Sequence, residues 1–244
     1  MKLKRRSKCP LCGNAARKFF RAPRPGETFF RCQACGLVYQ TLVASRSEQT
    51  LWYNQSWRAP SDAVEQQNRN YAQKYLVPKV KGMQLLEIGS NSGAMLEELR
   101  GFGYQVLGVE PAADLAALRP DLPVVVGFFE TAPELEGRLF DVIVSFHVLE
   151  HVEFPVRFAK LVRRRLKPGG IWFNFMPNLD TWLEVRDGVA KFRERWIHVE
   201  TKHVGEHVQL FSAVTAQLLS RVAGFDMFKA GFQGDDLWFY AAVN

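Results

Sequence analysis

The chain is 244 residues long, carries a formal net charge of +7, and is 47% hydrophobic with 13% aromatic residues. This composition excludes a disordered chain, and the length suits one full α/β domain with a small appendage. No apolar run approaches the roughly 18 to 20 residues of a membrane span, and the basic N-terminus lacks the apolar segment of a secretory signal. We therefore expect a cytoplasmic protein that does not bind a membrane.

The first predicted module holds all four cysteines. They form two Cys-x-x-Cys pairs separated by 19 residues, and a glycine follows each pair. This spacing is typical of a zinc ribbon, in which four thiolates close a tetrahedron around a structural zinc ion. Two disulfides or a redox pair are the alternatives, but no secretion signal accompanies them. We assign the module to residues 1–42 and the metal ligands to Cys9, Cys12, Cys32 and Cys35.

The same module carries the surplus positive charge. Residues 1–31 hold ten Lys and Arg against one acid, Glu27, and the remaining 22 basic and 24 acidic residues leave −2 for the rest of the chain. A zinc ion held by four thiolates has a formal charge near −2, so nearby cations can simply offset it. Nucleic-acid binding is the other interpretation. We favour charge compensation.

Residues 43–80 are expected to form a connector followed by a helix. Ser, Asn and Pro interrupt any periodicity in the connector. From Ser61 the pattern predicts a helix with an apolar face that includes Val64, and Pro78 ends it. Three large aromatic residues of the connector are expected to pack on the main domain, with lining of its pocket as the alternative: Trp52, Tyr53 and Trp57.

Strands and helices alternate through the main domain, residues 81–244. This order predicts a doubly wound parallel sheet, and the short turn 234–236 makes the last two strands a hairpin. The predicted strands are 84–88, 105–109, 124–126, 142–146, 171–175, 225–232 and 237–243, and the predicted helices are 94–102, 112–118, 155–166 and 212–223.

The strongest functional motif follows the first of these strands. A Gly89-x-x-x-Gly93 turn leads into a helix, so a ligand can approach the backbone closely. Glu110 ends the next strand 21 residues after Gly89, near the spacing of an acid that binds ribose hydroxyls. Asn91 stands where a dinucleotide loop needs glycine, and the acid Glu87 suits a cationic ligand. The loop therefore favours S-adenosylmethionine over a dinucleotide.

Residues 84–175 resemble the core of class I methyltransferases. The resemblance rests on the Glu-Ile-Gly loop at 87–89, Gly-Val-Glu-Pro at 108–111, His-Val-Leu-Glu-His at 147–151 and Leu-Lys-Pro-Gly-Gly at 166–170, a turn into the fifth strand. The loop is similar to that of deoxysugar C-methyltransferases, which are longer. Compact methyltransferases with an N-terminal ribbon are more similar, through the segments 206–212 and 223–225. The fold class implied is α/β, a Rossmann-like class I methyltransferase sheet with a C-terminal antiparallel hairpin and a small N-terminal zinc ribbon.

The resemblance also implies a cofactor site. The loop residues would frame the methionine part of S-adenosylmethionine, the acid after the second strand would bind its ribose, and later residues would border the adenine and the sulfonium. Phe128 is expected in the core, and Glu150 is expected to cap or pair on a helix surface. The implied cofactor-binding residues are Glu87, Gly89, Ser90, Asn91, Gly93, Glu110, Pro111, Phe129, Glu130, Phe146, His147 and Val148.

The catalytic base is sought among the histidines, because methylation of a hydroxyl or carbon requires removal of a proton. All five histidines follow residue 146, and the segment 176–210 occupies the place of an acceptor lid. We expect the base to be His207, with His203 and His151 as the next candidates. No spacing among these histidines and acids predicts a second metal site.

The expected function is methyl transfer from S-adenosylmethionine to a small-molecule or glycan acceptor at oxygen, nitrogen or activated carbon. An RNA methyltransferase that grips its substrate with the basic ribbon is the alternative, although the Asn/Asp-Pro-Pro-aromatic segment of base-amine enzymes is replaced by Ser145-Phe-His-Val148. A non-catalytic zinc-ribbon adaptor is the second alternative. The acceptor and the oligomeric state stay open.

Overall fold

The computed structural model describes residues 3–20, 29–44, 48, 59–77, 83–186, 189–192 and 207–244. The chain divides into two units. Unit 1 comprises Met1–Ser45, His147–Lys160 and Asn174–Ala241, and unit 2 comprises Arg46–Phe146, Leu161–Phe173 and Ala242–Asn244. None of the helices in the described ranges is long and apolar enough to cross a membrane. The domain boundaries at residues 42 and 80 stay predictions.

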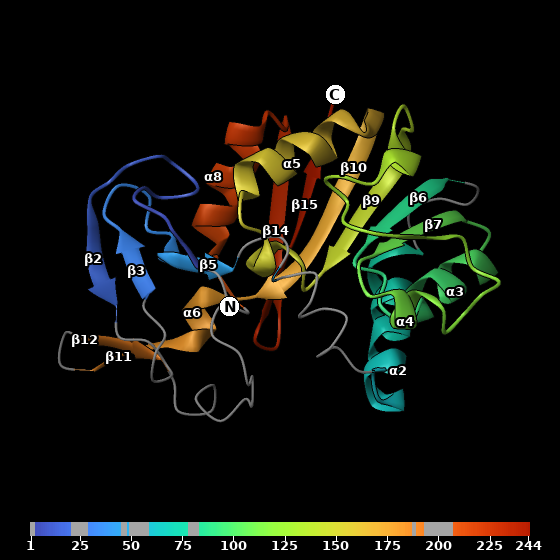
Figure 1. Ribbon diagram of the computed structural model, residues 1–244, viewed down its shortest axis with the longest axis horizontal. Coiled ribbons are helices and arrows are strands. Elements are labelled where there is room, and N and C mark those ends of the chain that lie inside the picture. The colour runs from blue at the N-terminus through green and yellow to red at the C-terminus, as the bar shows by residue number, and fades with distance from the viewer. Residues whose placement is uncertain are drawn as a thin grey trace. The chain divides into compact units, whose positions relative to one another are not determined.

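Unit 2 contains the parallel strands around the predicted loop (Figure 1). β6 pairs in parallel with β7 on one side and with β9 on the other, and β7 pairs in parallel with β8. The side chains of Leu85, Leu86 and Ile88 on β6 are buried, as expected for a strand covered on both faces. The elements are β6 (Gln84–Ile88), α3 (Ala94–Gly101), β7 (Gln105–Glu110), α4 (Ala113–Ala116), β8 (Val124–Val126), the short 3₁₀ turn η2 (Pro133–Leu135) and β9 (Phe140–Phe146).

The helix predicted from Ser61 is present in unit 2 in two parts. α2 (Asp62–Tyr71) is α-helical, and the chain then widens into the π-helical turn η1 (Ala72–Leu76). The buried face comes from η1, because Tyr75 and Leu76 are buried whereas Val64 is 43% exposed. The expectation that Val64 belongs to the apolar face was wrong.

Two long elements, α5 (Pro155–Arg164) and β10 (Leu166–Pro177), contribute residues to both units. The predicted helix 155–166 ends at Arg164, because Leu166 already belongs to β10. The segment 166–170, expected as a turn, is strand: Gly169 N–H donates to Val243 O, and Val243 N–H donates to Gly170 O. The seven-stranded sheet also includes β14 (Met227–Gln233) and β15 (Asp236–Ala242), and its strand order is β14-β15-β10-β9-β6-β7-β8.

Unit 1 combines the N-terminal strands with the C-terminal hairpin. Its four-stranded sheet has the order β13-β4-β3-β2, and β1 pairs separately with β5. The elements are β1 (Leu3–Arg5), β2 (Arg17–Phe20), β3 (Phe29–Cys32), β4 (Val38–Gln40), β5 (Leu42–Ala44), η3 (Leu149–His151), α6 (Leu179–Trp182), β11 (Leu183–Arg186), β12 (Val189–Phe192), β13 (Gln209–Leu210), α8 (Ala213–Ala223), β14 (Met227–Gln233) and β15 (Asp236–Ala242).

The predicted fold class is confirmed, since the parallel strands and the hairpin of β14 and β15 are present. α8 has the ends that its sequence predicts. Ser212 and Thr215 exchange side-chain and backbone hydrogen bonds in a capping box, and Gly224 ends the helix at a φ of +89°. The pairing of β5 with β1 was not expected, because the chain from residue 43 onward was assigned to a connector.

Candidate active site

The loop after β6 has the backbone shape that its glycines predict. Gly89 N–H donates to Val109 O at 2.8 Å, which ties the loop to β7. Gly89, Asn91 and Gly93 have φ values of +73°, +51° and +80°. A Cβ at Gly93 would lie 2.7 Å from Leu122 Cδ1, so both the backbone angle and the close approach require glycine.

Three polar atoms of this loop region are buried without a hydrogen-bond partner among the described residues: Glu87 Oε2, Ser90 Oγ and Asn91 Oδ1. Burial raises the pKa of Glu87 well above its usual value, and the charge of Glu110 raises it further. Unsatisfied buried polar groups are costly, so a bound cationic group with N–H donors would stabilise all three. The amino group of S-adenosylmethionine has this chemistry and the sulfonium adds a second positive charge, so the predicted residues fit that cofactor.

Glu110 connects the loops after β6 and β7. Its Oε2 accepts a hydrogen bond from Asn91 N–H and its Oε1 accepts one from Ala112 N–H, both at 2.9 Å. Burial raises the pKa of Glu110, although the two backbone donors lower it. Each carboxylate oxygen has a second lone pair, so the group can still accept a ribose hydroxyl. Pro111, which follows it, is half-buried.

The other cofactor residues expected in unit 2 differ in exposure. Phe129 is buried, and the Arg165 guanidinium lies 6.0 Å from its ring centroid. Phe128 and Glu130 are both half-buried, so Phe129 is the more buried of the two phenylalanines, the reverse of the expectation for Phe128. Phe146 at the end of β9 is half-buried and stacks on Tyr71 with ring centroids 6.0 Å apart. No signal in the sequence pointed to Tyr71 as a neighbour of the site.

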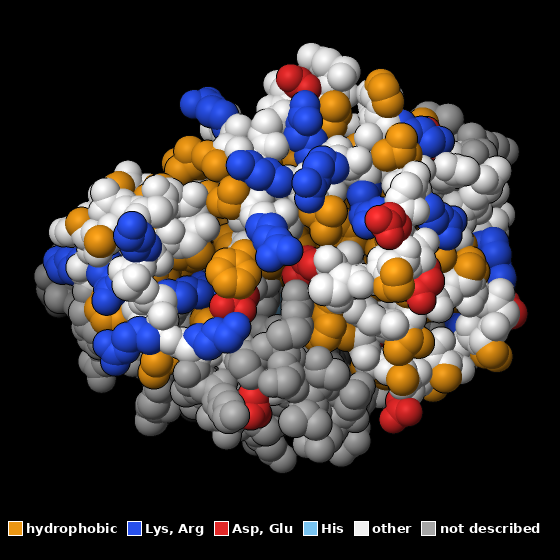
Figure 2. Space-filling view, turned by 45° about the horizontal axis from the view of Figure 1, so that its top comes forward, with side chains coloured by type: hydrophobic (Ala, Val, Ile, Leu, Met, Phe, Trp, Pro, Cys, Tyr) orange, Lys and Arg blue, Asp and Glu red, His pale blue; other side chains and the backbone are white. Residues whose placement is uncertain are grey.

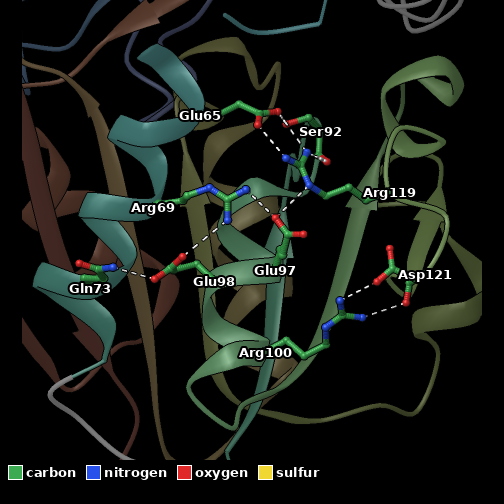
Figure 3. Close-up of polar contacts among 9 residues, drawn as sticks. All are labelled: Glu65, Arg69, Gln73, Ser92, Glu97, Glu98, Arg100, Arg119 and Asp121. Atoms are coloured by element: carbon green, nitrogen blue, oxygen red, sulfur yellow. Dashed lines mark hydrogen bonds and ion pairs between the residues drawn. The ribbon is translucent and has the colours of Figure 1, made fainter. Parts of the chain in front are cut away.

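A network of charged side chains fastens α2 to the loop and to α3 (Figure 3). Ser92 Oγ donates to Glu65 Oε1 at 2.5 Å, and Arg119 donates to Glu65 Oε2 at 2.7 Å and to Ser92 O at 2.6 Å. Arg119 and Arg69 both reach Glu97 Oε2, at 3.2 and 2.5 Å. Sequence reasoning missed this network because its members lie in separate segments.

The histidine candidates in unit 1 gather around one buried carboxylate, and we call Glu150, His147, His151 and His207 the Glu150 cluster. His147 Nδ1 lies 3.3 Å from Glu150 Oε1, and the ring centroids of His151 and His207 are 4.9 Å apart. Glu150 is 1% exposed, and its Oε2 has no hydrogen-bond partner in the described ranges. The expectation of a surface role for Glu150 was therefore wrong.

The charges of this cluster are strongly coupled. Burial would raise the pKa of Glu150, but the His147 hydrogen bond and the neighbouring histidines lower it to about 2. Desolvation would lower the pKa of His147, but the hydrogen bond and charge of Glu150 and the charge of Asp236 raise it above its ordinary value. Burial raises the pKa of Asp236 to about 6 against the effect of His147. Asp236, at the start of β15, belongs to this electrostatic environment and was not anticipated.

His147 and Val148 connect β9 to the Glu150 cluster. His147 has a left-handed backbone with φ of +51°, and its side chain is 46% exposed. In the described part of the chain, only Asn91 and His147 adopt such a backbone without being glycine. Both follow the carboxyl end of a parallel strand, and residues with such backbones cluster at functional sites. Val148 is half-buried at the start of η3.

The four cysteines lie together in unit 1. Cys9 Sγ is 3.6 Å from Cys35 Sγ, and Cys12 Sγ is 3.5 Å from Cys32 Sγ. Zinc–sulfur bonds of about 2.3 Å in a tetrahedron place sulfurs about 3.8 Å apart, so the donor set fits zinc. Two matching turns present the pairs, since Gly13 N–H donates to Cys9 O and Gly36 N–H donates to Cys32 O, both at 3.0 Å.

A second set of potential metal ligands lies within the Glu150 cluster. Glu150, His151 and His207 each offer one ligand atom, and these atoms lie within 4.8 Å of one another. The sequence did not predict this set because its third member is 56 positions from the second. Some expectations lie outside the described residues: the base candidate His203, and the aromatic residues Trp52, Tyr53 and Trp57.

Comparison with known proteins agrees with this geometry. Residues 63–230 match a family described as a methyltransferase domain. The chain is 32% identical over 100 residues to a ubiquinone biosynthesis O-methyltransferase of Roseobacter denitrificans. That match covers 37% of this chain and 40% of the relative, so it spans well under half of the relative's length.

Two solved structures share the fold. One is a SAM-dependent methyltransferase of Thermotoga maritima, described as a possible histamine N-methyltransferase. It has a TM-score of 0.57 and 19% identity, over 81% of this chain and 95% of that one. The other is the plantazolicin methyltransferase BpumL, solved with a substrate analogue and SAH. It has a TM-score of 0.55 and 14% identity, over 82% of this chain and 90% of that one.

Proposed function

The chain belongs to the methyltransferase family as a SAM-dependent enzyme, and we propose that it methylates a hydroxyl group of a small molecule. The observation that carries the proposal is the buried Glu150 beside three histidines, directly after β9. A hydroxyl acceptor needs a base for its proton, whereas an amine acceptor can bind as the free base. The similarity to ubiquinone biosynthesis O-methyltransferases supports the same acceptor class.

We assign the base to His207, with His151 as its neighbour. Because the pKa of Glu150 is about 2, its carboxylate is ionised at neutral pH and stabilises a protonated imidazole beside it. His207 takes the proton from the acceptor hydroxyl, and Glu150 offsets the charge that results. His203 stays a candidate base and lies outside the described residues.

The cofactor site is proposed in unit 2. When bound, S-adenosylmethionine supplies the electrophilic methyl group. Glu87 faces its cationic groups, the loop 89–93 accommodates the methionine part, and Glu110 accepts from the ribose. Phe129, Glu130 and Phe146 are assigned to the adenine and sulfonium surroundings, with His147 and Val148 following on the chain. We further propose one structural zinc ion on Cys9, Cys12, Cys32 and Cys35.

The test uses the full chain, S-adenosylmethionine and a panel of small hydroxyl compounds that begins with catechol. Release of S-adenosylhomocysteine and the mass of the product identify methylation. Replacing His207→Asn should lower the rate by roughly 10²- to 10⁴-fold, the usual contribution of a general base. His151→Asn should have a smaller effect. Activity only on amines, or an unchanged rate in both variants, would reject the proposal. A strict dependence of the rate on added Mg²⁺ would show that the Glu150 cluster binds a cation instead of supplying the base.

Methylation of RNA is the second candidate, favoured by one observation. Exposed cations lie on the N-terminal strands and turns, and Figure 2 shows Lys and Arg side chains gathered at the left of this face. Arg6 argues for charge compensation: burial lowers the pKa of its half-buried guanidinium to about 10, and the charges of Glu153 and Cys9 oppose that effect. RNA binding that weakens steeply between about 50 and 200 mM salt would favour the RNA candidate. A steep loss of affinity is expected because a protein that contacts roughly 6 to 10 phosphates displaces counterions that added salt restores. The exposed cations are Lys4, Arg5, Lys8, Lys18 and Arg31.

A further inference from the structure

In the described residues 207–212, the chain that carries His207 has little secondary structure of its own. β13 has only two residues, and it exists because it pairs with β4 of the ribbon, Gln209 opposite Tyr39 and Leu210 opposite Val38. Gln40 N–H extends the ladder by donating to Val208 O at 2.9 Å. Isolated pairs of short strands are marginal in water, so the ribbon provides the template on which this segment is ordered.

Two buried glutamine side chains continue the connection. Gln40 is 1% exposed, and its Nε2 donates to the carbonyl oxygen of His207 at 2.9 Å. Gln209 is fully buried, and its Nε2 donates to Leu149 O at 3.0 Å and to Val152 O at 2.8 Å. Both amide protons of Gln209 are therefore used on the two ends of η3.

The η3 turn carries the other members of the cluster. Leu149 and Val152 flank Glu150 and His151, so the Gln209 amide holds the turn from both sides. Val208 N–H adds a third bond to this turn, to Glu150 O at 2.9 Å. Buried amides are costly unless they are hydrogen-bonded, so the energetics favour this arrangement of η3 over displaced ones.

Two cysteines of the proposed zinc site lie next to β4. Cys32 ends β3, and Cys35 lies three residues before β4. Cys32 N–H donates to Leu37 O at 2.9 Å, which fixes the turn between the two strands. Leu37, Val38 and Tyr39 are completely buried, so a shift of this turn would move a packed strand.

We propose that the zinc ribbon positions the Glu150 cluster for catalysis through the side chains of Gln40 and Gln209. This inference rests on the proposed function only for the catalytic role of the cluster, because the contacts themselves are structural. Gln40 and Gln209 act as positioning residues: Gln40 holds the backbone of His207, and Gln209 holds the backbone on both sides of Glu150 and His151. In the proposed mechanism neither side chain touches a reacting group. The hydrogen bonds that connect the ribbon to the Glu150 cluster all lie within unit 1, whereas Glu87, the loop 89–93 and Glu110 belong to unit 2.

The experiment compares Gln40→Met and Gln209→Met with the exposed α8 variant Gln217→Met, all in the zinc-loaded full chain. Methionine keeps the approximate shape and removes the donors. We expect the imidazole NMR resonances of His151 and His207 to move in the first two variants. Methyl transfer to the hydroxyl compound found in the panel should fall by roughly 10- to 100-fold, the scale expected when a reacting group is misplaced by about 1 Å. The calorimetric Kd for S-adenosylmethionine should stay unchanged.

Removal of the metal by a chelator provides the second arm. It should move the same histidine resonances and leave the affinity for S-adenosylmethionine in place, as checked by calorimetry on the same sample. Circular dichroism confirms that each protein is folded. Unchanged histidine resonances in both folded glutamine variants would overturn the inference. If the resonances move while the His207→Asn rate is normal, the positioning stands and the proposed base fails.

Discussion

The loop after β6, with Glu87 and Glu110 beside it, and the Glu150 cluster both contain buried acids, but they are assembled in opposite ways. The loop residues Glu87 to Gly93 and the acid Glu110 come from two consecutive strands. The cluster joins residues 147–151 to His207, and ribbon residues 38–40 hold that second segment. Local segments can therefore specify the proposed cofactor site, whereas the proposed acid–base site requires three distant parts of the chain to meet.

The two regions also treat their acids differently. Glu87 lies beside another acid, and its pKa is raised by burial and by Glu110. Glu150 lies beside histidines, and despite its burial its pKa is lowered to about 2. Burial and Glu110 thus disfavour a charged Glu87, whereas the neighbouring histidines favour a charged Glu150. The roles that we propose, binding a cation at Glu87 and stabilising a transient imidazolium at Glu150, agree with this difference.

The largest expected effect comes from Glu150→Gln, which keeps the shape and removes the charge. The methyl-transfer rate should fall by roughly 10²- to 10⁴-fold, because the base loses the anion that stabilises its protonated form. The Kd for S-adenosylmethionine should not change. Steady-state kinetics measure the rate and calorimetry measures the Kd on the same preparation. A parallel loss of affinity for S-adenosylmethionine would contradict separate roles for the two regions.

The reverse pattern is expected for Glu87→Gln. Loss of a hydrogen bond to a charged group costs about 1.5–3 kcal/mol, so the Kd for S-adenosylmethionine should rise roughly 10- to 150-fold. At saturating cofactor the rate should stay near that of the unmodified protein. The exposed Glu134→Gln serves as the matched control. A lower saturated rate at unchanged Kd would contradict the assignment of Glu87.

A smaller effect is expected for Arg119→Leu, which releases α2 from the loop (Figure 3). Partly exposed ion pairs contribute about 0.2–1 kcal/mol each, so the cofactor Kd should rise only about two- to fivefold. Arg100→Leu, which removes the exposed pair with Asp121, is the control and should leave the Kd unchanged. Equal effects of the two variants would show that the contact with Ser92 has no role in the loop.

The smallest effect concerns Asp236→Asn and is a change of pKa. An ionised Asp236 favours protonated His147, so its removal should lower the pKa of His147 towards the ordinary value. The effect should be largest above about pH 6, where Asp236 is ionised. NMR titration of the His147 ring measures it, with the exposed Asp226→Asn as the control. A raised pKa of His147 would contradict the coupling.

The fold was largely predictable because its elements are signalled locally. The strand 84–88 was predicted with the bounds that the structure shows, and the helix predicted at 212–223 is present as α8 (Ala213–Ala223). The sequence misled where tertiary contacts decide. The Lys-Pro-Gly-Gly segment has the composition of a turn, yet pairing with Val243 makes it strand. Val64 fits an apolar helix face, yet the buried face is supplied by the π-helical turn.

The sequence by itself determined the cysteine pairs, the glycine loop and the acid that ends β7, because each depends on backbone conformation and spacing over a few residues. Only the tertiary structure decided that Glu150 is buried among histidines and that Gln40 and Gln209 connect this cluster to the ribbon. Hydrogen bonds such as that from Gln40 to His207 join residues 167 positions apart. No local pattern encodes such a contact, since it forms only when burial brings both segments to the same place.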